Sequence, residues 1–117
     1  MKPASAKNKG RLLQKWIVLQ ILSRYSALTE DDVTSRSMGA AGEDILMSPK
    51  ARGKFPFSIE AKNTERINLY KFYAQAVENA KDLHEPLLIV KSNGRKPLAV
   101  VDADWFIRTF KPTTQGR

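Results

Sequence analysis

The chain has 117 residues, which is enough for one domain with a single hydrophobic core. It contains no cysteine and one histidine, so disulfides, thiolate ligands and histidine-based zinc sites are excluded, and any metal ion must be held by oxygen atoms. Twenty Lys and Arg residues face twelve Asp and Glu residues, giving a formal net charge of +8. This balance favours a polyanionic partner, with nucleic acid as the leading candidate.

The longest apolar runs have about five residues, far fewer than a membrane span needs. The N-terminus also lacks the apolar core of a signal peptide. We therefore expect a cytoplasmic protein with no membrane partner.

In the first half of the chain, residues 1–8 are small, polar and basic, and are predicted to form a flexible arm. Apolar residues then recur at helical spacing from Arg11 to Tyr25, which predicts a largely buried helix. "DDVTSR" (31–36) and "EDILMS" (43–48) are predicted strands joined by a glycine-containing link.

In the second half, "PKARGK" (49–54) is expected to be a basic loop that joins a hairpin of strands 43–48 and 55–62. A confident helix begins at Leu69 after the N-cap Asn68, and "PLLIV" and "PLAVV" are buried strands joined by an Asn-Gly turn. Asp102 caps a last short helix, and residues 112–117 are a polar tail. The prediction is one α/β domain over residues 9–111, with a mixed sheet and the order αβββαββα.

Acidic and basic side chains meet in the predicted hairpin. Asp44 and Glu60 can approach within a few ångströms, and Lys62 lies beside Glu60 because side chains two apart in a strand share a face. Two close carboxylates repel unless a divalent cation sits between them. Such a group can bind Mg2+ and act on a phosphodiester, although Glu-x-Lys alone is equally compatible with a surface ion pair.

Asp44 and Glu60-Ala61-Lys62, in this setting, resemble the PD-(D/E)xK nuclease superfamily with its restriction-endonuclease-like core. The chain is most similar to small Holliday-junction-resolvase-like endonucleases of archaea and bacteriophages, which act in DNA recombination. The segments that carry the resemblance are "KGRLLQKWIVLQIL", "DDVTSRSMGAAGEDILMSP", "FPFSIEAKN" and "KPLAVVD". If the chain is phage-encoded, its expected location is the host cytoplasm.

The resemblance implies a role for each residue of the motif. Asp44 and Glu60 would hold Mg2+, or alternatively Mn2+, with the Ala61 carbonyl as a further ligand, and Lys62 would act on the attacking water. Glu43 should point to the opposite face of its strand and is better explained as a surface acid.

Two positions depart from the family patterns. Archaeal resolvases carry a metal-binding Glu in the first helix, where this chain has Gln14. Related exonucleases carry a Gln-x-x-x-Tyr motif, which Gln75 and Asn79 match only in the Gln. Both glutamines are catalytic candidates, and both could equally be solvated helix residues.

Several polar and basic residues are predicted to contact DNA phosphates, because hydroxyl and guanidinium groups suit that task. The alternative is that they are ordinary loop and tail residues. They are Lys9, Arg11, Ser35, Arg36, Ser37, Lys50, Arg52 and Lys54.

The sequence therefore predicts a Mg2+-dependent endonuclease that cleaves branched DNA such as four-way junctions. Symmetric cleavage needs two active sites, so we expect a homodimer, formed through the last helix or a sheet edge. The alternatives are a nuclease of this superfamily that nicks or degrades DNA from its ends, and a non-catalytic basic DNA-binding protein.

Overall fold

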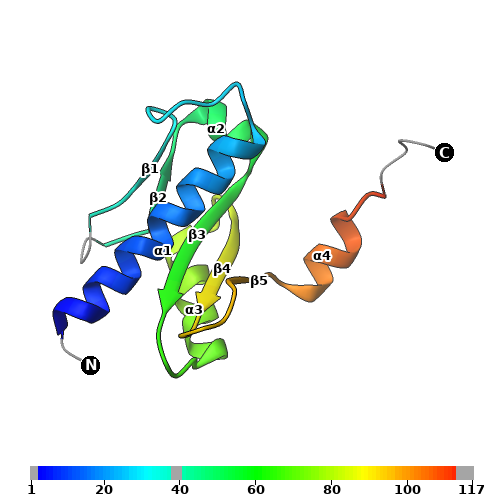
Figure 1. Ribbon diagram of the computed structural model, residues 1–117. Helices are drawn as coiled ribbons and strands as arrows, with labels where there is room; N and C mark the ends of the chain where they lie inside the picture. Colours follow the sequence, from blue (N-terminus) through cyan, green and yellow to red (C-terminus); the bar gives the residue numbers. More distant parts are fainter. Residues whose placement is uncertain (1–2, 38–40, 113–117) are drawn as a thin grey trace.

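The computed structural model describes residues 3–37 and 41–112, and it shows a mixed α/β fold (Figure 1). The elements in chain order are α1 (Pro3–Arg24), β1 (Val33–Ser35), β2 (Ile45–Met47), α2 (Pro49–Lys54), β3 (Phe57–Asn63), α3 (Leu69–Ala80), β4 (Glu85–Lys91), β5 (Leu98–Val100) and α4 (Ala103–Thr109). In the main sheet, β3 pairs parallel with β4 and β4 pairs antiparallel with β5. The prediction of an α/β protein with a mixed sheet is thus confirmed.

The two faces of the main sheet are covered by different helices (Figure 1). Along β4, Leu87 and Ile89 belong to the core under α1, whereas Leu88 and Val90 belong to the core under α3. This division follows from the alternation of side chains along a strand. The same alternation in β3 turns Ile59 toward α1, and therefore places Glu60 on the face that α3 covers.

Helix α1 is longer and less buried than the sequence predicted. It includes residues 3–8, which we expected to be a flexible arm, and proline at the first position of a helix is tolerated. Only a narrow stripe of Leu13, Ile17 and Ile21 is buried with the core, since one helix face contacts the sheet. Residues 1 and 2 of the predicted arm, residues 38–40 of the predicted link and residues 113–117 of the predicted tail lie outside the described residues.

The predicted hairpin of the second and third strands is wrong. β2 pairs antiparallel with β1, and the "PKARGK" segment forms the helix α2 instead of a loop. Ser48 caps α2, because its Oγ accepts a hydrogen bond from Ala51 N at 3.1 Å, and Pro49 fits the first helical turn. β2 and β3 are still neighbours, since Asp44 N, just before β2, donates to Ile59 O at 2.9 Å.

β5 is not the buried strand that the sequence predicted, because it lies at the edge of the sheet and Leu98 is 60% exposed. The caps and the turn agree with the sequence. Asn68 caps α3, Asp102 caps α4, and Gly94 in the β4–β5 turn has a φ of +73°, which glycine adopts readily. Helix α4 projects away from the body of the molecule (Figure 1) and has no buried residue. Within the described residues, no helix is both long and apolar enough to cross a membrane.

Candidate active site

Asp44, Glu60 and Lys62 line one cavity of about 440 Å3 at the edge of β3 that faces β2. The cavity lies between α1 and α3, so residues from four separate parts of the chain contribute to its walls. They are Gly10 and Gln14 of α1, Ala41, Gly42 and Asp44 before β2, Glu60, Ala61 and Lys62 of β3, and Gln75 and Asn79 of α3. The predicted meeting of the two acids and the lysine is therefore present in the fold, although no hairpin produces it.

Glu60 is the most deeply buried acid of the site, with 3% of its surface exposed. Its Oε1 accepts a hydrogen bond from Asn79 Nδ2 of α3 at 3.0 Å, and its Oε2 lies 3.5 Å from Lys62 Nζ. Lys62 Nζ also lies 5.3 Å from the centre of the Phe72 ring, within the range of a cation–π contact. The carboxylate and the ammonium are thus held in place by α3 and by each other.

The Asp44 side chain is hydrogen-bonded to the edge of β3 that does not pair with β4. Its Oδ2 accepts a hydrogen bond from Ala61 N at 2.7 Å, so the side chain takes the place of a neighbouring strand. The N–H and C=O of one residue in a strand point to the same side of that strand. The Ala61 carbonyl therefore faces the edge at which Asp44 lies, as a third ligand from this segment would require.

Burial raises the pKa of both carboxyl groups. For Asp44, loss of water contact outweighs the hydrogen bond from Ala61 and the attraction of Lys62, so its pKa lies above the ordinary range. For Glu60, burial and then repulsion by Asp44 raise the pKa, while Asn79 and Lys62 oppose the change. A cation between the two carboxylates would remove this repulsion and favour their charged forms.

The oxygen atoms of the cavity fit a magnesium ion better than zinc. Asp44 uses Oδ2 for a hydrogen bond, which leaves Oδ1 for a cation, whereas Glu60 Oε1 accepts from Asn79 and Glu60 Oε2, paired with Lys62 at 3.5 Å, has a further lone pair to offer. Among residues 3–37 and 41–112, no group of three or more His, Cys, Asp or Glu side chains could hold a metal ion. Mg2+ commonly binds through one or two carboxylates and keeps several waters, so two acids, a carbonyl and an amide suffice.

The structure places both candidate glutamines at the cavity. Gln14 is buried, with 5% of its surface exposed, and so it is not a solvated residue on the outer face of α1. Gln75 is exposed but lines the same cavity from α3. Their part in catalysis stays a prediction.

Asn79 is the site residue that sequence reasoning missed. The sequence analysis treated it only as a departure from an exonuclease motif, yet its amide is bonded to Glu60. Helical spacing could have found it, because Gln75 and Asn79 are four residues apart and share one face of α3.

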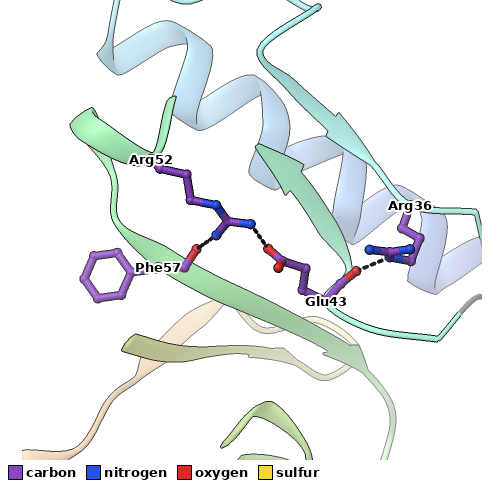
Figure 2. Close-up of polar contacts among 4 residues, drawn as sticks. All are labelled: Arg36, Glu43, Arg52 and Phe57. Atoms are coloured by element: carbon purple, nitrogen blue, oxygen red, sulfur yellow. Dashed lines mark hydrogen bonds and ion pairs between the residues drawn. The ribbon is translucent and has the colours of Figure 1, made fainter. Parts of the chain in front are cut away.

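The predicted phosphate-binding arginines are partly engaged in structural contacts (Figure 2). Arg52 forms an ion pair with Glu43 at 2.6 Å and donates to Phe57 O at 2.8 Å, so its guanidinium group is already engaged within the protein. The short α2 turns Arg52 inward, which an extended loop would not have done. Arg36 donates from Nε to Glu43 O at 2.6 Å. Glu43 does not line the cavity. It is not the surface acid that the sequence predicted, because it lies before β2 and its largely buried side chain pairs with Arg52.

Gly42 lets the loop before β2 lie close to Arg36. It has a φ of +99°, and a Cβ at this position would come within 3.3 Å of the Arg36 guanidinium group. Arg36 is also near Asp44, and its charge opposes the rise in the pKa of that carboxyl that burial causes. The arginine therefore fixes the loop that carries Asp44.

The other predicted DNA-contacting residues do not line the cavity. Ser35 at the end of β1 and Ser37 after it are exposed, as are Lys50 and Lys54 on α2 and Arg11 on α1. Lys9 differs from these residues, because its Nζ is buried and has no hydrogen-bond partner among the described residues.

Comparisons of the chain with known protein families, with curated proteins and with solved structures found no match. Function must therefore be argued from the cavity itself.

Proposed function

We propose that this protein is a Mg2+-dependent DNA endonuclease of the PD-(D/E)xK type that hydrolyses phosphodiester bonds in branched DNA, as Holliday-junction resolvases do. The observation that carries the proposal is the convergence of Asp44, Glu60 and Lys62 on one cavity. A protein that only bound DNA would gain nothing from two buried acids on its DNA-facing surface.

The fold supports the proposal at the level of strand arrangement. An α-helix precedes an antiparallel strand pair, and the strand with the Glu-x-Lys residues then pairs parallel with the strand that follows α3. We take this order as a restriction-endonuclease-like core with α2 added between the second and third strands. The added helix changes the path of the chain but leaves Asp44 beside Ala61.

Each side chain of the cavity has a role in the proposed reaction. Asp44 and Glu60, with the Ala61 carbonyl, would hold Mg2+, which supplies Lewis-acid polarisation of a phosphoryl oxygen. Lys62 is held between Glu60 and Phe72, where its ammonium can orient the attacking water by hydrogen bonding and stabilise negative charge on the phosphate. The Gln14 amide can bind a further water without adding charge.

The overall charge supports a DNA substrate. With a net charge of +8, the chain attracts the DNA backbone, and binding should weaken steeply as salt displaces these contacts. Lys50, Lys54 and Arg11 are exposed and can contact phosphates, whereas Arg52 is held by Glu43. The proposed DNA surface therefore excludes Arg52.

A homodimer belongs to this proposal, because one chain offers one cavity and a four-way junction is cut at two places. Helix α4 supports it, since Phe106, Ile107 and Phe110 are exposed and no residue of the helix is buried. A second copy would cover these residues and place two active sites about a two-fold axis.

The test of the proposal is cleavage of labelled four-way junctions, flaps, linear duplexes and single strands, with Mg2+ and with a chelator. Glu60→Gln should lower Mg2+-dependent cleavage at least about a hundredfold, because a cation ligand is lost. Junction binding in chelator should be unchanged. The matched control is Glu65→Gln, which removes the same charge from an exposed residue outside the cavity.

Each alternative function gives a different result in this panel. Products cut from the ends of linear DNA, or single nicks, would show that the nuclease acts on a substrate other than the four-way junction. Salt-sensitive binding without any divalent-dependent product would show a non-catalytic DNA-binding protein. Undiminished cleavage by Glu60→Gln would reject the site.

A further inference from the structure

A second cavity, of about 480 Å3, lies on the other side of α1 from the active site. It is bounded by α1, the end of β3 and the turn between β4 and β5. Small-molecule sites in proteins usually measure about 300–1,000 Å3, so the cavity is large enough for a nucleobase. Its lining residues are Lys9, Leu12, Leu13, Trp16, Asn63, Lys91, Asn93, Gly94 and Pro97.

The second cavity is adjacent to the proposed catalytic residues. Lys9 lines it, whereas the next residue, Gly10, lines the active site. In β3 the same division falls between Lys62, in the active site, and Asn63, in the second cavity. The two cavities therefore share α1 and β3 as walls.

One wall of the second cavity is apolar and aromatic. Trp16 is 42% exposed, so its indole is not buried in the core, and the exposed Leu12 and half-buried Pro97 complete this wall. Tryptophan side chains left at a surface beside basic residues are suitable for stacking with bases, because every base has a π-face.

The opposite part of the cavity contains polar atoms that lack partners. Lys9 Nζ and Asn63 Oδ1 are buried and have no hydrogen-bond partner within residues 3–37 and 41–112. Asn63 Nδ2 donates to Lys9 O at 3.0 Å, so the two residues are joined at the cavity wall. Buried polar groups without partners are costly, and a ligand with both an acceptor and a donor would satisfy them after small side-chain rotations.

We propose that the second cavity binds one unpaired nucleotide of the DNA substrate, with its base against Trp16 and its polar edge at Lys9 and Asn63. This inference rests on the proposed action on DNA. The positive charge of Lys91 matches a nucleotide phosphate, whereas the apolar wall would have no use in a site for phosphate alone. An unpaired base is most easily extruded at a branch point, where stacking is already interrupted, so the cavity would favour branched DNA.

The test compares two four-way junctions that each carry one extra nucleotide at the branch point. In one junction the nucleotide has its base, and in the other it is abasic, so the phosphate backbone is the same. Binding is measured by fluorescence anisotropy in chelator, where no cleavage occurs. The wild-type chain should bind the base-bearing junction about tenfold more tightly, as expected for one stacked base.

Three variants test whether the preference for the base-bearing junction depends on Trp16. Trp16→Ala should remove the preference for the base, and Trp16→Phe should keep most of it because an aromatic ring remains. The matched control is Leu19→Ala, which shortens another exposed apolar residue of α1 that does not line the cavity, and it should keep the full preference.

The inference is overturned if the wild-type chain binds both junctions equally, or if Trp16→Ala weakens both to the same extent. Cleavage of a fully paired junction with Mg2+ tests the nuclease separately. Cleavage without a base preference overturns the nucleotide site alone. A base preference without cleavage supports the nucleotide site and overturns the nuclease.

Discussion

The active-site cavity and helix α4 depart from ordinary burial in opposite ways. At the cavity, Glu60 and Gln14 are buried although they are polar. On α4, Ile107 and Phe110 are 74% and 61% exposed although they are apolar. Natural proteins more often bury the second kind of residue and expose the first.

Both departures are costly for the isolated chain. A buried carboxylate is destabilising unless hydrogen bonds or a cation compensate it, and at Glu60 the bonds of Asn79 and Lys62 compensate only partly. An exposed apolar face on a seven-residue helix gains stability only when another surface covers it. These two costs are the reason we propose a cation in the cavity and a second copy of the chain on α4.

After the loss of cleavage in Glu60→Gln, the largest effect is expected when the apolar face of α4 is made polar. Ile107→Glu should place a charge in the proposed dimer interface and weaken association by at least about thirtyfold, the loss typical of a central interface residue. Analytical ultracentrifugation across a concentration series measures this change. Asp104→Asn, an exposed change on the same helix, is the control. A wild-type chain that stays monomeric would contradict the proposed dimer.

A smaller effect is expected when the Glu60 carboxylate loses its hydrogen bond. Asn79→Ala should raise the Mg2+ concentration for half-maximal cleavage about tenfold, because residues that orient metal ligands commonly contribute that much to affinity. The maximal rate at saturating Mg2+ should change less, which separates positioning of Glu60 from a general loss of folded protein. The control is Glu78→Gln on the exposed side of α3. An unchanged Mg2+ requirement would show that Asn79 does not position Glu60.

The smallest effect is a change in stability with pH. Since the folded-state pKa of Glu60 is raised above its ordinary value of 4.5, the folded chain binds more protons than the unfolded chain in the window above that value. The contribution of Glu60 to the free energy of unfolding should therefore fall as pH rises through this window.

Glu60→Gln cannot lose this proton. In chelator, the stability of the variant relative to the wild-type chain should increase as pH rises above about 4.5 and become constant at higher pH. Denaturant unfolding at a series of pH values measures the difference. A difference that does not change with pH would mean that Glu60 is ordinarily solvated.

Elements that depend on residues close together in the sequence could be predicted, whereas strand pairing between distant residues could not. Helix α3 and the caps Asn68 and Asp102 could be read from the sequence, since they depend on residues within one or two turns. The position of β2 was also predicted, but its partner was not, because strand pairing depends on residues far apart in the chain. Ser48 and Pro49 signal the start of α2, a local pattern that the sequence analysis read as a loop.

In the candidate site, too, only the features that depend on local spacing could be predicted. Alternation along β3 placed Glu60 and Lys62 on one face, and this prediction required no knowledge of the fold. The bond of Asn79 to Glu60 and the ion pair of Arg52 with Glu43 join residues from different elements, so neither follows from local spacing. The exposure of Trp16 was hidden for the same reason, because helical periodicity does not tell how wide a face the sheet will cover.

The sequence by itself determined the α/β class, the basic charge and the pairing of Glu60 with Lys62 on one strand face, because composition and short-range periodicity suffice for these. The tertiary structure alone decided that Asp44 reaches the free edge of β3 through Ala61, and that α1 and α3 close a cavity around the two acids. These contacts join residues that are far apart in the chain. They form only when the two helices pack on opposite faces of the sheet.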